Sequence, residues 1–444
     1  MDFLYEIKQM PAISSHEHIG SLASIGMEEN VGFYCDMIPG REAGHTNLFD
    51  LIFSPYFGGL LQAAGYCSPF GSKPKTALDG DEQQQLWNSL TPFLATCRGT
   101  GLYIALDTAL TELHGVSLDK MLDEGKAWQQ VSESITAKYE QGMYCWSKEM
   151  FEKAGLVCAL KPVHLSYVAG IKVGDADPAC QEEHKLFVPI YRVDDLLGTP
   201  DKDGGCDWNH AEEVLDMQVK SLEDVHRMVE RTFSLVENRH IKAIKQLQAY
   251  MRILEFKPVE SITAAKALEQ VRHKNPAGIL PLQDYIMGLI LEKACRLKLP
   301  YQIHTGMANL PASNPAWLTG TIQRHPEVDF VLLHCYPYLS EAAYMARTYR
   351  NVYLDTAWLA LQSPQLLYRA LHEWLGFVPY SKICLSTDAT SVEECYGAMC
   401  ITREVLSRVL KEKVESRQLN EETAMDAAKA LLHDNSQRLY RLSC

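Results

Sequence analysis

Short apolar runs that alternate with amphipathic segments organise the C-terminal half of the chain. Apolar positions recur with helical spacing over 281–297, 315–324, 340–349 and 364–374, and a short apolar run follows each segment. The runs are apolar throughout rather than alternating, which is typical of strands buried on both faces. Helical segments and strands in this order predict βαβ units and a parallel sheet.

Eight such runs occur along the chain, which predicts an α/β fold of the (β/α)₈ TIM-barrel type. The earlier four are expected over 10–18, 156–160, 187–192 and 240–246. The eight runs end near His18, Lys161, Arg192, Lys245, His304, His334, Asp355 and Asp388. In a closed barrel of parallel strands these ends gather at one rim, where barrel enzymes carry their chemistry.

The interval between the first two strands is too long for a loop and is predicted to be an inserted helical subdomain. Helical spacing recurs in it over 81–97, 101–113 and 129–154. We therefore expect three parts: 1–25 with the first strand, 26–150 as the helical subdomain over the barrel mouth, and 151–444 as the rest of the barrel with the C-terminal helices.

Two further segments have their own patterns. Residues 170–207 are rich in Gly, Asp and Pro on either side of the third strand, so we expect mobile loop there. Residues 420–439 have the spacing of a final amphipathic helix.

Composition and charge limit the partners of the protein. Lys and Arg number 42 against 56 Asp and Glu, a net charge of −14, which is unfavourable for nucleic-acid binding. The chain shows neither a signal-peptide pattern nor an apolar run approaching the ~20 residues that cross a bilayer. The 13 cysteines are scattered without a Cys-x-x-Cys pair, as in a reduced protein. We therefore expect a cytoplasmic protein with no nucleic-acid or membrane partner.

Histidines and one aspartate at the predicted strand ends indicate a metal centre. His16 and His18 close the first strand and, two residues apart, share one of its faces. His304, His334 and Asp388 end the fifth, sixth and eighth strands. Because imidazole with carboxylate is a ligand set that Zn²⁺ accepts, the convergence of these side chains predicts a metal site.

Motifs along the predicted strands resemble one known family. They are the pair His16 and His18, and the stretches Lys245 to Tyr250, Pro281 to Tyr285, Gln302 to Gly306, Leu332 to His334, Tyr336 to Tyr338, Asn351 to Asp355, Lys382 to Ala389 and Asn435 to Tyr440. Over 156–442 and the first twenty residues, the chain resembles the amidohydrolase superfamily. It is similar to its barrel-fold branch that includes the hydrolase-like domain of nodulin-related glutamine-synthetase fusions. Ser15 departs from the pattern, since family members often carry Asp there.

The resemblance implies a role for each strand-end residue. His16, His18 and Asp388 would bind a divalent metal, Zn²⁺ in the first place and Mn²⁺ in the second, with one or two ions per chain. His304 would be a further ligand or lie against the metal-bound water. His334 would be a second-metal ligand or an electrophile that polarises the substrate. From its chemistry, Asp388 is also expected to be the general base, and Asp355 to be a structural group or one that orients a histidine.

Two basic residues at strand ends have several possible roles. Lys245, if buried, could form a carbamate that bridges two metals or could bind a substrate carboxylate; the alternative is a solvated head on a buried stem. Arg192 could clamp an anionic substrate in a bidentate manner or form a surface salt bridge. His164, His210 and His433 lack a strand-end position, and we expect them on the surface.

The leading functional hypothesis is a metal-dependent hydrolase that acts on an amide, ester or lactone of a small polar or anionic molecule. In this reading, His334 and Lys245 stabilise the oxyanion. A first alternative keeps the scaffold for a non-oxidative decarboxylase or a uronate-type isomerase, because fold does not determine reaction. A second alternative is a non-catalytic barrel used as a binding module. The resemblance also implies a homo-oligomer.

Overall fold

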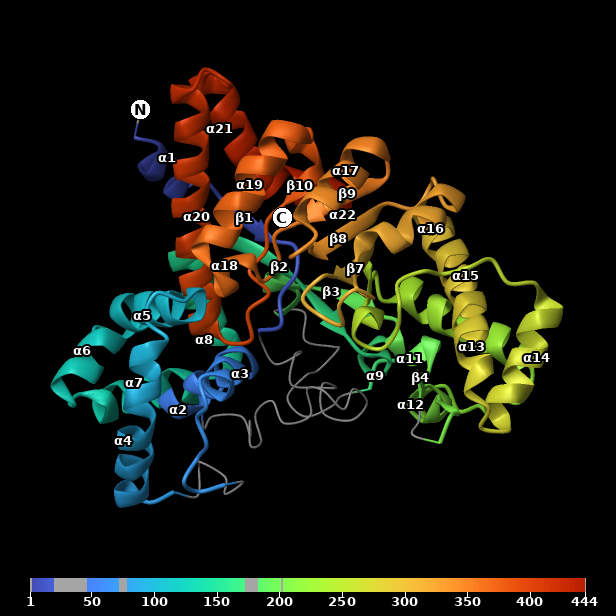
Figure 1. Cartoon of the computed structure of the whole chain (residues 1–444), viewed down its shortest axis with the longest axis horizontal. Coiled ribbons are helices and arrows are strands. Elements are labelled where there is room, and N and C mark those ends of the chain that lie inside the picture. The colour runs from blue at the N-terminus through green and yellow to red at the C-terminus, as the bar shows by residue number, and fades with distance from the viewer. Residues whose placement is uncertain (1, 20–45, 72–77, 172–182, 201–202, 444) are drawn as a thin grey trace.

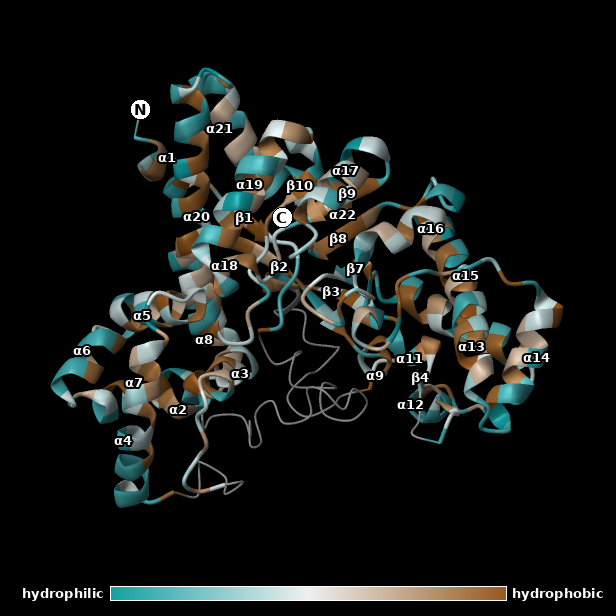
Figure 2. Ribbon diagram, in the orientation of Figure 1, coloured by the Kyte–Doolittle hydropathy of each residue, from teal (hydrophilic) through white to brown (hydrophobic). Residues whose placement is uncertain are grey.

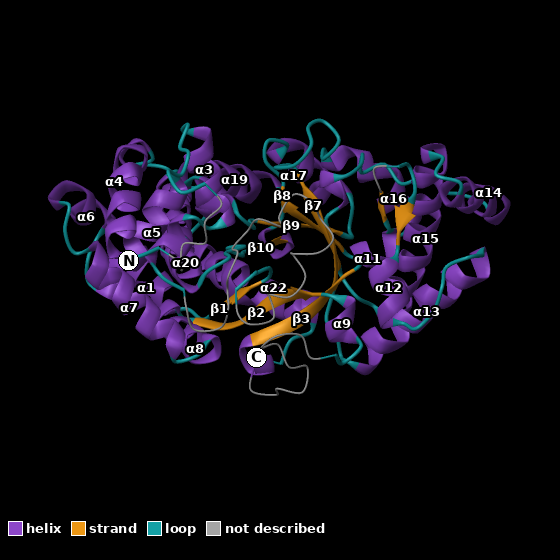
Figure 3. Cartoon of the chain, turned by 90° about the horizontal axis from the view of Figure 1, so that it is seen from below, coloured by secondary structure: helices purple, strands orange, loops and turns teal. Residues whose placement is uncertain are grey.

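A computed structural model describes residues 2–19, 46–71, 78–171, 183–200 and 203–443. Its centre is a sheet of eight strands in the order β1-β2-β3-β6-β7-β8-β9-β10, with every neighbouring pair parallel. The strands are β1 Ala12–Ser14, β2 Leu156–Val163, β3 Phe187–Arg192, β6 Ile244–Gln246, β7 Tyr301–Thr305, β8 Phe330–His334, β9 Val352–Asp355 and β10 Ile383–Cys384. Figure 3 shows them curving around a common centre. The predicted barrel-type fold with eight parallel strands is confirmed.

The first and last strands meet just beyond their regular hydrogen-bonded ladders. Ser15 N donates to Leu385 O at 3.2 Å, and Asp388 N donates to His16 O at 3.1 Å. These bonds join the segment after β1 to the segment after β10, and so bring the two ends of the eight-strand order together. The residues that make this junction include two of the predicted metal ligands.

Both faces of the sheet are buried, which explains the uninterrupted apolar runs. In β8, Phe330 and Leu332 pack into the main hydrophobic core, whereas Val331 and Leu333 pack on the opposite face with Tyr440 near the C-terminus. All four strand residues have no exposed surface. Because side chains alternate between the two faces, a strand covered on both sides must be apolar at each of these positions.

Amphipathic helices cover the outside of the sheet (Figure 1). In α13, Leu222–Asn238, the buried residues lie three or four apart: Val225, Met228, Val229, Thr232, Phe233 and Val236. The other helices after β2 include α9 Leu165–Val168, α12 Asn209–Val214, α15 Ile279–Leu297, α16 Thr319–Arg324, α17 Leu339–Thr348, α18 Leu359–Gln362 and α19 Pro364–Phe377. Figure 2 shows hydrophobic and hydrophilic residues along these helices. This spacing is the periodicity on which the predicted helices rested.

The chain between β1 and β2 forms helices throughout its described part, and Figure 1 shows them together at one side of the sheet. They are α2 Leu48–Ile52, α3 Pro55–Ala63, α4 Gly80–Thr96, α5 Gly101–His114, α6 Leu118–Glu124, α7 Trp128–Glu140 and α8 Met143–Ala154. The single helix predicted over 129–154 is two helices, because Gly142 at φ 94° breaks it. Residues 26–45 and 72–77 lie outside the described residues, and the division into three domains stays a prediction.

Helix α5 packs closely on α20, Val392–Glu415, which follows the last strand. Gly397 of α20 lies so near the Ala105 backbone of α5 that a Cβ on Gly397 would clash with the Ala105 carbonyl. This contact packs the helices between β1 and β2 against α20, the helix that follows Asp388 in the chain.

Three sequence predictions need correction. The described part of 170–207 is not mainly loop: α10 Glu183–Leu186 precedes β3, and α11 Asp194–Leu197 follows it with the hairpin of β4 Thr199–Pro200 and β5 Cys206–Asp207. Residues 172–182 and 201–202 of this segment lie outside the described residues. The final helix predicted over 420–439 divides into α21 Glu421–Lys429, a π-helical turn Ala430–Asp434 and α22 Asn435–Tyr440.

The third correction concerns helices that the sequence pattern did not reveal. Helix α1 spans Phe3–Gln9, α14 spans Ser261–Arg272, and α20 is 24 residues long. Residues on many sides of α20 are buried, so it has no clear polar face. Neither α20 nor any other helix in the described ranges has the length and apolar character needed to cross a membrane.

Candidate metal centre

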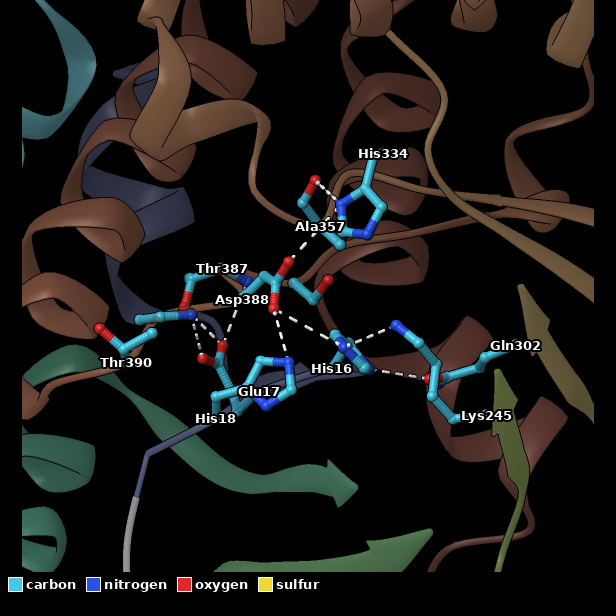
Figure 4. Close-up of polar contacts among 12 residues, drawn as sticks. His16, Glu17, His18, Lys245, Gln302, His334, Ala357, Thr387, Asp388 and Thr390 are labelled. Atoms are coloured by element: carbon cyan, nitrogen blue, oxygen red, sulfur yellow. Dashed lines mark hydrogen bonds and ion pairs between the residues drawn. The ribbon is translucent and has the colours of Figure 1, made fainter. Parts of the chain in front are cut away.

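Two predicted metal ligands, His16 and His18, face the same carboxylate oxygen of a third, Asp388. His18 Nε2 lies 3.3 Å and His16 Nε2 lies 3.6 Å from Oδ1 of Asp388 (Figure 4). Donor atoms of a tetrahedral zinc site, with bonds of about 2.0–2.1 Å, lie about 3.3 Å from one another. One ligand atom from each residue falls within 4.8 Å of the others. These side chains therefore have the spacing of three ligands around a single cation.

The chemistry of this donor set fits a metal. Oδ1 of Asp388 is buried and has no hydrogen-bond partner among the described residues. Burial, reinforced by nearby Lys245, holds the pKa values of His16 and His18 well below their usual range. Neutral imidazoles offer lone pairs, and a buried carboxylate needs a positive partner. A divalent cation would satisfy all three groups.

Gln302 fixes which nitrogen of His16 faces the cluster. The Gln302 amide nitrogen donates to Ser15 O at 2.7 Å and to Tyr440 Oη at 2.8 Å. Its Oε1 therefore faces His16 Nδ1, at 2.9 Å, and can only accept a hydrogen bond. Nδ1 of His16 carries the proton, and Nε2 presents a lone pair towards Asp388. Gln302 lies two residues before His304 on one strand face, which is the sequence signal that could have identified it.

His304 and His334 lie beside this cluster. Their ring centroids are 4.1 Å apart, and Nε2 of each ring is buried without a hydrogen-bond partner in the described part of the chain. His334 Nδ1 donates to Ala357 O at 3.0 Å and lies 3.5 Å from Asp388 Oδ2. Burial, followed by the charge of Lys245, lowers the pKa of His334. A neutral His334 with its proton on Nδ1 presents a lone pair at Nε2, which favours the ligand role over the electrophile role.

Two residues of the site have left-handed backbone conformations. His334 has φ 64° and Asp388 has φ 57°. Such values are uncommon for residues with a Cβ and mark positions where the surrounding structure imposes the conformation. His334 is the last residue of β8 and Asp388 lies four residues beyond β10, and at both positions the chain turns with the side chain held in the cluster.

Lys245 lies within the cluster rather than at the solvent. Its Nζ is 3.2 Å from His16 Nε2, and the residue is 1% exposed. Burial lowers its pKa to about 8, against the raising effects of Asp388 and Asp194. The Lys245 amine is not exposed to solvent, which excludes one of its three alternatives. Formation of a carbamate and contact with the substrate remain.

Arg192 is buried at the end of β3, so it does not form a surface salt bridge. It is 3% exposed, with Nη2 3.4 Å from His164 Nδ1 and Nε 4.0 Å from Asp194 Oδ2. The predicted surface position of His164 is also wrong, because that residue is 8% exposed and packs against Asp195 and His210. The sequence missed this second cluster because the second strand was predicted to end at residue 160, whereas β2 continues to Val163, and because Asp195 and His210 lie on helices.

Acidic residues behind the site hold its backbone. Asp355 is buried and accepts hydrogen bonds from Ser15 Oγ, Ser386 Oγ and Ala357 N. These contacts are to the segments that flank the site rather than to a histidine, and they fit the structural alternative for Asp355.

Glu17, between the two histidines, points to the other face of the strand. It accepts hydrogen bonds from the Ser14 and Thr387 hydroxyls and, at 2.8 Å, from Ala389 N. Burial raises its pKa to about 7 against these hydrogen bonds. Glu17 thus links the segment after β1 to both neighbours of Asp388, a role that the sequence pattern did not indicate.

The C-terminal part of the chain matches a known family. Residues 264–442 match the family described as amidohydrolase, a narrower range than the resemblance over 156–442. The curated protein fluG of Emericella nidulans is 39% identical over an alignment of 175 positions, and the match covers 37% of this chain. That match covers 20% of fluG, so this chain spans about a fifth of the relative.

Solved structures share the fold over almost the whole chain. A Lactobacillus casei protein assigned as a metal-dependent hydrolase has a TM-score of 0.67 at 18% identity and covers 99% of this chain and 97% of its own. Glucuronate isomerase of Caulobacter crescentus has a TM-score of 0.75 at 13% identity, with coverages of 100% and 93%. Uronate isomerase of Thermotoga maritima has a TM-score of 0.72 at 13% identity, with coverages of 99% and 96%. At these identities the similarity establishes the fold.

Proposed function

We propose that this chain, whose residues 264–442 match the amidohydrolase family, is a metal-dependent hydrolase of a small, anionic amide, ester or lactone. The observation that carries the proposal is the single oxygen of Asp388 shared by His16 and His18, at 3.6 and 3.3 Å. His16, His18 and Asp388 would hold the cation, and His304 would complete the first ligand set.

A divalent cation in this position supplies a Lewis acid and lowers the pKa of a water molecule bound to it. The side chains of the protein supply the remaining steps. Oδ2 of Asp388 is turned away from the two imidazoles, towards His334 at 3.5 Å. That oxygen is placed to accept a proton from the attacking water and to return it to the leaving group. Lys245, in contact with His16, would stabilise negative charge that develops on the substrate oxygen.

Buried cations around His18 favour an anionic substrate. Lys245, Lys161 and Arg192 all add to the effect of burial in lowering the pKa of His18, so their charges lie near this ring. Each of the three residues is at most 3% exposed. This positive charge would attract a substrate carboxylate.

The same positive charge also supports the second candidate, a uronate-type isomerase. Uronates carry a carboxylate that Arg192 could hold, and the residues that hold the cation would then orient a hydroxy-carbonyl group while a base moves a proton. We rank isomerisation second because Asp388 Oδ2 is placed to accept a proton from an attacking water, which is the step that hydrolysis requires.

The test is turnover by purified protein loaded with Zn²⁺ or Mn²⁺. Panels of N-acyl amides, esters, lactones and uronates, each with charged and neutral members, would be assayed with the native chain, Asp388→Asn and the control His226→Gln. We expect hydrolysis of a carboxylate-bearing substrate that falls at least ~100-fold in Asp388→Asn and is retained in His226→Gln. His226 is a suitable control because its Nε2 contacts the Tyr285 hydroxyl, at 2.8 Å, in an exposed position. Isomerisation of uronates without any hydrolysis would reject the hydrolase and favour the second candidate.

A further inference from the structure

A second group of metal-ligating side chains lies at the ends of β2 and β3. His164 follows β2 directly, Asp195 belongs to the short helix after β3, and His210 belongs to α12. One ligand atom of each lies within 4.8 Å of the others. None of these residues belongs to the His16, His18 and Asp388 cluster.

The carboxylate of Asp195 is oriented towards both imidazoles. Its Oδ1 is 3.4 Å from His210 Nδ1, and its Oδ2 is 3.9 Å from His164 Nδ1. Leu165 N donates to Oδ2 at 3.3 Å and holds the carboxylate in this position. The separation of 3.4 Å is close to the distance of about 3.3 Å between neighbouring ligand atoms around tetrahedral zinc.

The His210 ring is held by a neighbour outside the donor set. Its Nε2 lies 2.7 Å from Ser166 Oγ. When Nε2–H donates to this hydroxyl, Nδ1 presents its lone pair towards Asp195. Metal-ligating histidines are characteristically oriented by such a hydrogen bond at the other ring nitrogen.

The side chains of His164 and Asp195 are buried, with 9% and 3% of their surface exposed. A buried carboxylate needs a positive partner, which a divalent cation would supply.

The guanidinium of Arg192 is the main opposing charge. It lies 3.4 Å from His164 Nδ1, where it would repel a metal ion. Asp194, whose Oδ2 is 4.0 Å from Arg192 Nε, offsets part of that charge. Asp194 and Asp195 together place two carboxylates near the single guanidinium of Arg192.

We propose that His164, Asp195 and His210 form a second divalent-metal site, suited to Zn²⁺ and similar borderline cations and separate from the centre at Asp388. Two imidazoles and one carboxylate leave a coordination position for water or for another oxygen ligand. The proposal does not depend on the proposed hydrolase function.

Zn²⁺ binding by the full-length chain tests the second site. The double variant His16→Gln/Asp388→Asn removes the first centre, and equilibrium dialysis with elemental analysis then counts the ions that remain. We expect one Zn²⁺ per chain in this background. Adding Asp195→Asn or His210→Gln should weaken that binding at least ~100-fold, whereas adding His226→Gln should leave it unchanged.

A spectroscopic measurement separates coordination from folding. Co²⁺ bound in the His16→Gln/Asp388→Asn background should give visible absorption bands that disappear with His210→Gln while the far-ultraviolet circular dichroism stays the same. The alternative is that Asp195, His210 and Ser166 are joined only by hydrogen bonds. The background variant would then be folded and bind no Zn²⁺, or its Zn²⁺ would persist when Asp195 and His210 are changed. Either result overturns the second site.

Discussion

The side-chain oxygen of Gln302 lies 2.9 Å from Nδ1 of His16, and the two other hydrogen bonds of the Gln302 amide leave that oxygen no other orientation. A glutamine on β7 thereby sets the tautomer of a histidine that follows β1. This contact would aim the lone pair of His16 Nε2 at a metal, because a ligand must present its lone pair in the correct direction.

Replacing Gln302 should weaken metal binding without removing a ligand. We expect Gln302→Leu to lower Zn²⁺ affinity about 10- to 100-fold, because His16 loses the acceptor that orients it. Competition with a chromophoric chelator measures the change. The matched control is Tyr440→Phe, which removes another hydrogen-bond partner of Gln302 but keeps the contact with His16. Equal effects of the two substitutions would contradict the orienting role.

The state of Lys245 should be visible in the number of bound metals. Two ions at the Asp388 centre would indicate a Lys245 carbamate, and one ion would indicate a free amine. The count is best made in the Asp195→Asn variant, so that the second cluster does not contribute, and with and without bicarbonate. If the carbamate forms, Lys245→Ala should lose one ion; a variant that keeps two would rule the carbamate out.

The contact between α5 and α20 should be sensitive to one methyl group. Gly397→Ala places a Cβ against the Ala105 carbonyl, so we expect the free energy of unfolding to fall by about 1–3 kcal/mol in urea denaturation. Gly288→Ala on α15 is the control, since its Cβ would meet no atom within 4 Å. That substitution should be neutral or stabilise by up to about 1 kcal/mol. Similar losses for both variants would disprove the close packing at Gly397.

Lys382 should make stability depend on pH in the alkaline range. Burial lowers its pKa from 10.5 to about 8 in the folded protein, where it donates to Ala346 O and Tyr349 O. Between about pH 8 and 10.5 the unfolded chain holds a proton that the folded chain has released, so this residue makes the unfolding free energy rise with pH. Below pH 8 the lysine is charged in both states and contributes no slope.

Urea denaturation at pH 7.5 and 9.5 would measure the Lys382 contribution as a difference between variants. Between these two pH values the unfolding free energy of Lys382→Met should rise less, or fall more, than that of the native chain. The exposed Lys411→Met variant controls for removal of a lysine as such. An unchanged pH dependence in Lys382→Met would show that the folded protein does not release this proton.

Much of the barrel follows from local pattern. Strand β3 has the predicted bounds, and β8 and β9 end at the predicted residues His334 and Asp355, because each of these apolar runs ends in a polar residue. Helix α20 was not predicted because it is buried on many sides and lacks a polar face. The break at Gly142 was not predicted because the helical periodicity continues across it.

The sequence by itself determined the eight parallel strands and the residues at their ends, because hydrophobic periodicity and strand termination are properties of neighbouring positions. Only the tertiary structure decided which of those residues meet. It brought Asp388 to His16 and His18, turned Gln302 towards His16 and buried Lys245 among them. It also joined His164, Asp195 and His210, although the sequence pattern predicts His164 and His210 at the surface and gives no signal for Asp195. These contacts depend on closure of the sheet and on backbone turns between distant segments, which no local spacing encodes.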